Sequence, residues 1–201
     1  MINVNAKLLA AVSLAQSTDK TRYYICGVYF ENGLMAATDG NIFTCAQEET
    51  GLEAGQGAIL PISKKVQTAA KKSNASTVEI DDGVIKVLDG HHNILHMEPV
   101  KEIDGTYPNF RHIVPDIKGL TSSGAFNVPI LDHIKDVAKI LTPSRNKLTP
   151  VWIVGDNATD AHIARYGASE KIFSVVMPVN MKVKGEEAFA STGKPDWFAA
   201  A

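Results

Sequence analysis

The sequence contains little that points directly to a chemical function. Its 201 residues include only two cysteines, Cys26 and Cys45, which are too few for a disulfide scaffold or a zinc site. No apolar run approaches the roughly 18 residues that a membrane-spanning helix needs. Twenty basic side chains are balanced by 22 acidic ones, so the formal net charge is only −2. These absences exclude a disulfide-rich scaffold, a helical membrane protein and a generally basic protein.

A secretion signal is also poorly supported. The apolar segment 8–15 follows Lys7 and has the length of a short signal core, but it has one preceding positive charge and no clear cleavage site. The same residues form a plausible amphipathic helix with Leu8, Leu9 and Val12 on one side. We therefore expect a cytoplasmic protein.

The signatures of common enzymes are missing: there is no G-x-S-x-G, Walker loop, GxGxxG or H-E-x-x-H. His91, His92 and His96 lie near Asp89, but a metal-binding spacing would require a helix, and Asp89-Gly90 with Asn93 indicates a turn. We predict a protein that is not an enzyme and has no metal or other cofactor. A small enzyme that uses the histidine cluster remains the alternative.

Two further catalytic interpretations are weaker than structural ones. Cys26 and Cys45 lie in strand-like stretches, so reduced buried thiols are simpler than a nucleophile paired with a distant histidine. Asp39 in Thr38-Asp39-Gly40 could be catalytic, but an Asp-Gly hairpin turn is the commoner arrangement.

The pattern of apolar residues predicts an α+β protein in which one unit is used three times. Each unit is a helix followed by three or four short antiparallel strands, with the helices on one face of the sheets. The Asn32-Gly33 pair predicts a hairpin with a type I′ turn. Helices are predicted over 5–19, 61–74 and 129–141, and strands over 22–30, 34–37, 42–46, 77–80, 84–88, 94–97, 151–154, 162–166 and 173–177.

Charge is distributed unevenly between these elements. The segments 61–74, 129–147 and 5–20 carry formal charges of +4, +2 and +1, while the rest of the chain sums to −9. If the helices share one face, that face is basic and suits sequence-independent contact with phosphates. Lysines on solvated helix faces are the simpler alternative.

Five segments, in order, resemble the bacterial sliding clamp, the beta subunit of DNA polymerase III. Residues 22–31 (RYYICGVYFE) resemble a run of its middle domain, and residues 36–40 (AATDG) resemble its VATDG. Residues 59–61 stand where that domain enters its second helix. Residues 104–115 (DGTYPNFRHIVP) resemble the junction to its last domain, and residues 126–128 and 175–179 resemble its final helix start and its C-terminal VVMPM.

The resemblance implies a DNA-clamp-like fold, a ring whose helices surround duplex DNA, and no active site. It implies partners that are duplex DNA, bound without sequence preference, and peptides of DNA polymerases and clamp loaders, together with homo-oligomer formation. The residues that it places toward DNA, together with those of the basic helices, are Lys20, Arg22, Tyr23, Tyr24, Lys64, Lys65, Lys71, Lys72, Lys135 and Lys139.

The resemblance also implies a hydrophobic cleft for short peptide motifs, in which a methionine would form an adaptable wall. Its two walls map onto Thr38, Gly40, Asn41 and Ile42 on one side and onto Val176, Met177, Pro178 and Val179 on the other. Residues 41–43 are Asn-Ile-Phe where the family usually has His-Arg-Leu, which removes a positive charge from the rim.

The chain is short for this family. We expect a clamp-type domain of two units over 1–115, a shortened second domain over 116–183 and a flexible tail over 184–201, in which Trp197 and Phe198 could form a docking peptide. Such a clamp would suit a phage or mobile element. The alternative function is a clamp derivative that forms no ring and acts as an adaptor or decoy for clamp-binding proteins.

Overall fold

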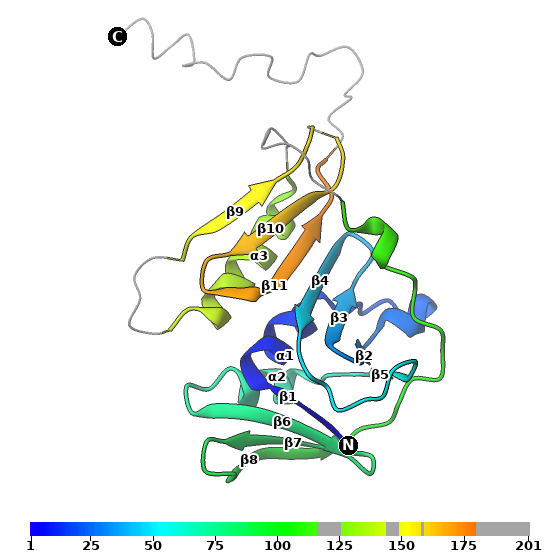
Figure 1. The fold of residues 1–201 in the computed structure, drawn as a ribbon, viewed down its shortest axis with the longest axis vertical. Coiled ribbons are helices and arrows are strands. Elements are labelled where there is room, and N and C mark those ends of the chain that lie inside the picture. Colours follow the sequence, from blue (N-terminus) through cyan, green and yellow to red (C-terminus); the bar gives the residue numbers. More distant parts are fainter. Residues whose placement is uncertain (116–125, 144–148, 158, 180–201) are drawn as a thin grey trace, which may run out of the picture.

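The computed structural model describes residues 1–115, 126–143, 149–157 and 159–179 (Figure 1). These residues form two antiparallel sheets, which we call sheet A and sheet B. Sheet A has the strand order β1-β6-β7-β8, and sheet B the order β5-β2-β3-β4-β11-β10-β9. The α+β fold with repeated helix–sheet units is therefore confirmed. No helix of the described residues is long and apolar enough to cross a bilayer.

The elements follow the predicted repeat. The first unit contains α1 (Ala6–Val12), β2 (Val28–Glu31), β3 (Leu34–Thr38) and β4 (Ile42–Gln47), and the second contains α2 (Lys64–Ala70), β6 (Ala75–Asp81), β7 (Val84–Asp89) and β8 (Ile94–Pro99). The third contains α3 (Val128–Leu141), β9 (Val151–Val154), β10 (His162–Tyr166) and β11 (Ser169–Val176).

Two strands that the sequence analysis missed tie the first two units together. β1 (Ile2–Asn5) precedes α1 but pairs with β6 of the second unit, and β5 (Gly57–Leu60) precedes α2 but pairs with β2 of the first. Each unit therefore supplies one strand to the sheet of the other. In β1 the residues Ile2 and Val4 are buried and alternate with exposed asparagines, which is the pattern of a half-buried strand.

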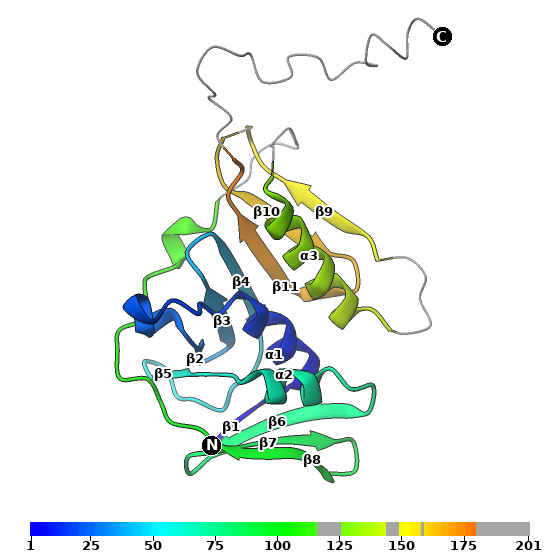
Figure 2. The ribbon, with the colours of Figure 1, turned by 180° about the vertical axis from the view of Figure 1, so that it is seen from behind.

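The third unit joins the first through a continuous sheet. β11 pairs with β4 in an antiparallel register that sets Val176 opposite Ile42 and Ile172 opposite Ala46. The helices of the three units also pack together, since α1 contacts both α2 and α3. Figure 2 shows α3 in front of β10 and β11, whereas in Figure 1 it lies behind them. The predicted division at residues 115 and 116 remains a prediction, because residues 116–125 and 180–201 lie outside the described part.

The segment predicted as a strand over 22–30 is wrong in its first half. Residues Lys20–Ile25 form η2, two short 3-10 turns separated by a kink at Arg22, and the strand begins only at Val28. The cause is local, because an Asp19 carboxylate oxygen accepts hydrogen bonds from the Thr21 backbone N–H at 3.0 Å and the Thr21 hydroxyl at 2.7 Å. Such side-chain caps compete with strand formation even where β-branched and aromatic residues favour it.

The first two predicted helices are too long. The helix predicted over 5–19 ends as α1 at Val12, followed by the 3-10 turn Ser13–Ala15, and the one predicted over 61–74 is shortened to α2. Ser63 caps α2 by accepting a hydrogen bond from the Val66 N–H at 3.2 Å. The third predicted helix is confirmed.

The hairpins at Asn32-Gly33 and Asp82-Gly83 differ in turn type. The Asn32-Gly33 hairpin forms, with Glu31 opposite Leu34, but only Gly33 has a positive φ, of 82°. The predicted type I′ turn is therefore wrong there, because both of its central residues need a positive φ. The Asp82-Gly83 pair meets that condition, with φ values of 52° and 73°.

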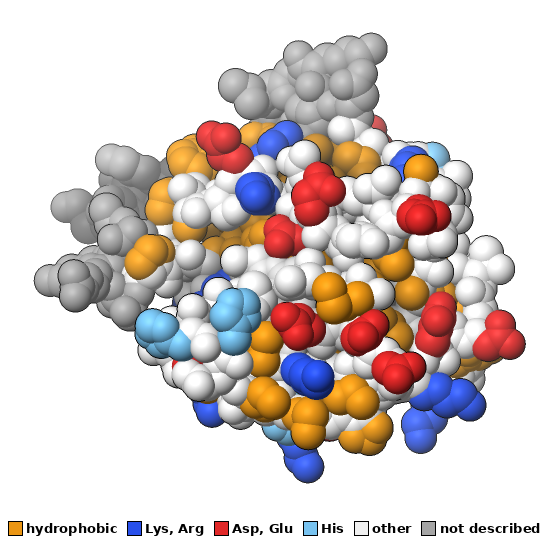
Figure 3. All heavy atoms as spheres, turned by 60° about the horizontal axis from the view of Figure 1, so that its bottom comes forward, with side chains coloured by type: hydrophobic (Ala, Val, Ile, Leu, Met, Phe, Trp, Pro, Cys, Tyr) orange, Lys and Arg blue, Asp and Glu red, His pale blue; other side chains and the backbone are white. Residues whose placement is uncertain are grey.

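The connector after β8 covers the outer face of sheet B. Tyr107 stacks on Tyr29 with ring centroids 4.8 Å apart, and Phe110 stacks on Phe43 at 5.0 Å. Arg111 forms an ion pair with Glu31 at the end of β2. The opposite face of sheet B packs on the helices in the main core. Among the described residues, helices pack on the inner face of sheet A only, and Figure 3 shows acidic side chains interspersed with apolar ones on its outer face.

Candidate peptide cleft and nucleic-acid interface

The two predicted walls of the peptide cleft meet at one end of sheet B. β4 begins at Ile42 and β11 ends at Val176, and these two residues are paired. The residues just before β4 and just after β11 therefore emerge side by side. They line a cavity of about 440 Å³, to which the start of α3 adds a third wall. The lining residues are Asp39, Asn41, Ile42, Asn127, Pro129, Ile130, His133, Met177, Pro178 and Val179.

Five of the eight predicted cleft residues line this cavity, namely Asn41, Ile42, Met177, Pro178 and Val179. The other three residues, Thr38, Gly40 and Val176, belong to the segments that form the two walls. Val176 is fully buried, and the Thr38 hydroxyl donates to the Ile42 carbonyl at 2.7 Å while accepting from the Gly40 N–H at 3.1 Å. Gly40 has a φ of 96°, which a residue with a side chain rarely adopts, and a Cβ there would lie 2.5 Å from the Arg22 guanidinium.

Asp39 stabilises the turn at the rim of the cleft through hydrogen bonds. One carboxylate oxygen accepts hydrogen bonds from the N–H groups of Asn41 at 2.8 Å and Ile42 at 3.0 Å, and the Arg22 guanidinium donates to the Asp39 carbonyl at 3.2 Å. These bonds fix the turn that starts β4. The geometry is that of a turn-forming aspartate and favours this interpretation of Thr38-Asp39-Gly40 over a catalytic one.

His133 of α3 also lines the cavity, although the sequence analysis did not predict it as a cleft residue. Its Nε2 lies 3.1 Å from the Thr44 hydroxyl, which lies 2.8 Å from the Ser174 hydroxyl, and the Tyr166 hydroxyl lies 2.8 Å from Ser174. This chain of polar groups runs between α3, β4, β11 and β10. Burial lowers the pKa of His133 to about 4, against the opposing effect of the Asp39 and Asp136 carboxylates. The imidazole is therefore neutral at pH 7, and among the described lining residues Asp39 is the one with a formal charge.

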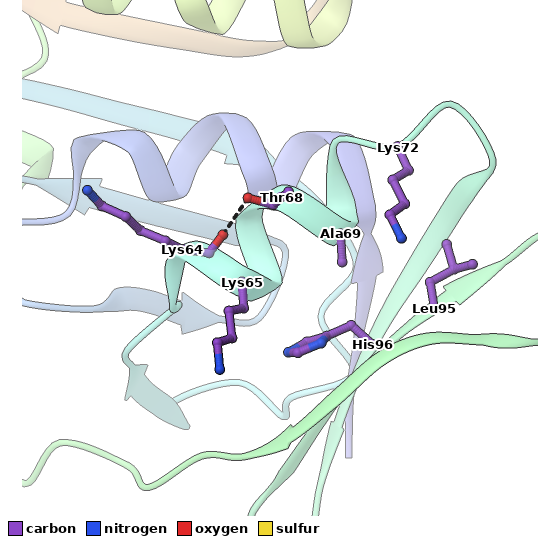
Figure 4. A pocket seen from close by; sticks show the side chains of 7 residues that line it. All are labelled: Lys64, Lys65, Thr68, Ala69, Lys72, Leu95 and His96. Carbon is purple, nitrogen blue, oxygen red and sulfur yellow. Dashed lines mark hydrogen bonds between the residues drawn. The ribbon is translucent and has the colours of Figure 1, made fainter.

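The basic residues of α2 form a second hollow. Lys64, Lys65 and Lys72 line a groove of about 380 Å³ together with Thr68, Ala69, Leu95 and His96, so it lies between α2 and the edge strand β8. Figure 4 shows Lys65 and Lys72 on the same side as His96, whereas Lys64 points away. Among the described residues no ion pair is formed by Lys64, Lys65, Lys71 or Lys72.

The other predicted DNA-contacting residues are partly engaged within the protein. Arg22 of η2 forms an ion pair with Asp19 at 3.2 Å, and Lys135 of α3 forms one with Asp132 at 2.6 Å. Tyr23 is about half exposed, at 53%, and its ring meets that of Tyr24 edge-on at 5.7 Å. Lys139 lies on the exposed side of α3, and Lys20 begins η2. Among the ten predicted residues, the four lysines around α2 are thus, like Lys20 and Lys139, in no ion pair with the described residues.

The histidines that suggested a metal site are dispersed. His91 and His92 lie in the turn between β7 and β8, where the Asp89 carboxylate accepts from the N–H groups of His91 and Asn93 at 2.8 and 2.9 Å. His96 is bound through its Nε2 to Glu98 at 2.8 Å. Within the described part of the chain, no three His, Cys, Asp or Glu residues are grouped so that they could hold a metal ion.

The two cysteines are free thiols in different surroundings. Cys45 is buried in β4, and burial raises the pKa of its thiol to about 12. Cys26 is partly exposed, and its thiol lies 3.2 Å from the Asp19 carbonyl. At neutral pH the Cys45 thiol is therefore protonated and poorly suited to act as a nucleophile.

Comparison with known proteins places the fold beside bacterial sliding clamps. No protein-family model and no curated protein matches the chain. The DNA polymerase III beta subunit of Thermotoga maritima matches 90% of this chain with a TM-score of 0.61 and 15% identity. The Pseudomonas aeruginosa sliding clamp, solved bound to griselimycin, matches 89% with a TM-score of 0.60 and 14% identity, and the Bacillus subtilis clamp matches 89% with 0.55 and 14%.

The chain spans slightly less than two thirds of these clamps, because the matches cover 66%, 65% and 63% of their lengths. At such low identity the comparison shows the fold alone. It confirms the clamp-like fold that the sequence resemblance implied, and leaves the roles of individual residues to experiment.

Proposed function

We propose that this protein is a sliding-clamp-type processivity factor of DNA replication. In this role it contacts duplex DNA without sequence preference through its basic helices, and it binds peptide motifs of DNA polymerases and clamp loaders in the cleft between β4, β11 and α3. It acts by tethering and catalyses no reaction. The observation that carries the proposal is that two segments distant in the sequence, around Asn41 and around Met177, line one cavity.

The composition of the cleft suits a short peptide with apolar anchor residues. Ile42, Ile130, Pro129 and Pro178 supply apolar surface, and Met177 can change its rotamer to fit different anchors. Met177 and Val179 are 49% and 39% exposed, so an inserted side chain would remove apolar surface from water on both partners. Such grooves derive affinity from a few buried anchors.

Griselimycin is the most direct probe, because two clamps with this fold were solved bound to it. We expect saturable binding in isothermal titration calorimetry and at least a tenfold loss of affinity in Met177→Lys. Met97→Lys is the matched control, because Met97 is an exposed methionine of similar accessibility, 55%, on β8. Absence of binding to the wild-type protein, or an equal loss in both variants, would count against the cleft assignment.

The DNA contact is supported by the lysines around α2, which form no ion pair with the described residues. Phosphate contacts give an affinity that falls steeply with salt and is independent of base sequence. We expect two duplexes of equal length and different sequence to bind with equal affinity in fluorescence anisotropy. A marked preference for one of them would contradict the proposed mode of contact.

A second candidate function is an adaptor or decoy that binds clamp-binding proteins without forming a ring. This function needs only the cleft, which the described residues around Asn41, Met177 and the start of α3 line within one chain. Light scattering coupled to size exclusion separates the two: an oligomer of defined mass supports a ring, and a monomer that still binds griselimycin supports the adaptor.

A further inference from the structure

The two ring nitrogens of His133 have different surroundings. Nε2 lies 3.1 Å from the Thr44 hydroxyl of sheet B. Nδ1 has no hydrogen-bond partner among the described residues, and it is not one of their buried unpaired polar atoms, so solvent reaches it. Because His133 lines the cleft, Nδ1 is the polar atom of this side chain that a ligand in the cleft can meet. Whether Nδ1 donates or accepts a hydrogen bond depends on which nitrogen of the neutral ring carries the proton.

The buried hydroxyl groups beside the ring determine the position of that proton. Thr44, Ser174 and Tyr166 are 0%, 0% and 3% exposed, and their hydroxyls form a chain that ends at His133 Nε2. The chain contains three hydrogen bonds, and each of them needs one hydrogen. The three hydroxyls hold three hydrogens, and the described residues offer these hydrogens no acceptor outside the chain.

One arrangement of these bonds gives every hydroxyl hydrogen an acceptor. In it Tyr166 donates to Ser174, Ser174 donates to Thr44, and Thr44 donates to His133 Nε2. If Nε2 carried the proton, it would supply one of the three bonds, and one buried hydroxyl hydrogen would have no acceptor. A buried donor without a partner is destabilising. The chain of hydroxyls therefore favours a bare Nε2 and a proton on Nδ1.

We propose that the hydroxyl chain fixes the Nδ1–H form of His133, and that Nδ1–H donates a hydrogen bond to a carbonyl oxygen of the peptide bound in the cleft. His133 thereby recognises the polar main chain of a ligand whose side chains bind the apolar walls. The proposal rests on the proposed function for the presence of the peptide, but the position of the proton follows from the fold alone.

The charges near His133 favour a neutral acceptor. Asp39, which is the formally charged residue of the described lining, and Asp136 of α3 both place negative charge near the ring. They would repel a carboxylate or phosphate group of a ligand, whereas a carbonyl group carries no net charge. Every residue of a peptide contributes one main-chain carbonyl, so a peptide anchored by apolar side chains always carries such acceptors beside them.

Nitrogen NMR of the full chain with isotope-labelled histidine tests the position of the proton. Correlations from the carbon-bound ring protons distinguish a protonated nitrogen from a bare one, and the His133 signals are assigned by their loss in His133→Gln. At pH 7 we expect a protonated Nδ1 and a bare Nε2 in the wild type. Thr44→Val removes the hydroxyl beside Nε2 and should produce a population with the proton on Nε2.

The wild-type spectrum decides this part even if a variant fails to fold. A wild-type ring with the proton on Nε2 would overturn the proposal. An unchanged Nδ1–H form in folded Thr44→Val would also overturn it, because the hydroxyl chain would then not fix the proton.

Griselimycin titration tests the donated hydrogen bond with two matched variants. His133→Asn keeps an N–H donor near the position of Nδ1, whereas His133→Leu has none, and both lose the hydrogen bond to Thr44. In isothermal titration calorimetry we expect about fivefold weaker binding by His133→Leu, the effect of one hydrogen bond, and a loss of less than about twofold in His133→Asn. The Nδ1 signal of the wild type should also shift at saturation.

Failure of this inference is distinguishable from failure of the proposed function. If the wild type binds griselimycin but the two His133 variants bind it equally, or the Nδ1 signal does not move, the role of His133 is overturned and the cleft stands. If the wild type does not bind griselimycin, the cleft assignment fails and the donated bond fails with it, while NMR still decides the position of the proton. Met177→Lys is the control, and it should weaken binding without moving the proton.

Discussion

The two sheets of this protein are built from similar strands but are covered differently. Sheet B has side chains packed on both faces, with the helices on one side and the connector residues Tyr107 and Phe110 on the other. Sheet A packs its inner face on the helices, and no described segment covers its outer face. Sheet B, which carries the cleft, is therefore packed on both faces, whereas sheet A, which lies beside the basic groove, is packed on one face.

Removal of an aromatic ring from the outer face of sheet B should cause the largest loss of unfolding free energy. Phe43→Ala on β4 deletes a side chain that is 2% exposed and stacked on Phe110, so we expect a loss of about 3–5 kcal/mol of unfolding free energy. Val84→Ala on the outer face of sheet A should cost less than about 1 kcal/mol, because Val84 is only partly buried. Urea unfolding of both variants measures the difference, and equal losses would contradict a one-sided sheet A.

The second prediction concerns the buried polar chain of sheet B. Because the pKa of His133 is lowered to about 4, protonation of the imidazole favours the unfolded chain. Its contribution to stability is complete above about pH 6.5 and is lost as the pH falls to 4, by about 3 kcal/mol. His133→Gln keeps a polar group beside Thr44 and removes the titration. Urea unfolding at pH 7.0, 5.5 and 4.5 should therefore show a shallower pH dependence in this variant; parallel curves would mean that His133 does not titrate as stated.

A third prediction compares the lysines around the groove with lysines of sheet A and of the connector after β8. Lys65→Ala/Lys72→Ala should reduce the slope of log affinity for duplex DNA against log salt concentration by about 2, at about 0.9 per phosphate contact. Lys86→Ala/Lys101→Ala is the matched control, because Lys86 belongs to β7 and Lys101 follows β8. Anisotropy titrations between 50 and 200 mM salt measure both slopes. A decrease of the same size in the control would contradict a DNA contact that is specific to the lysines around the groove.

These differences explain which parts were predictable from sequence. The strands of the third unit and the hairpin at Asn32-Gly33 follow from alternation and turn residues, which act locally. β1 and β5 were missed because each is four residues long and becomes a strand by pairing with the sheet of the other unit. In the same way, the cleft segments carried a family resemblance, whereas His133 reaches the cleft only because α3 packs across sheet B.

The smallest expected effect separates the two hairpins. In sheet A, Asp82 holds a positive φ of 52°, so Asp82→Ala places a Cβ residue without a local hydrogen-bonding side chain in a left-handed conformation, at a cost of about 1 kcal/mol. In sheet B, Asn32 has no positive φ, and Asn32→Ala should change stability by less than about 0.5 kcal/mol. Thermal unfolding of the two variants under identical conditions measures the contrast. If Asn32→Ala were the more destabilising, the side chain of Asn32 rather than its backbone conformation would stabilise the β2–β3 turn. The positive φ of Asp82 would then not account for the difference in stability between the two hairpins.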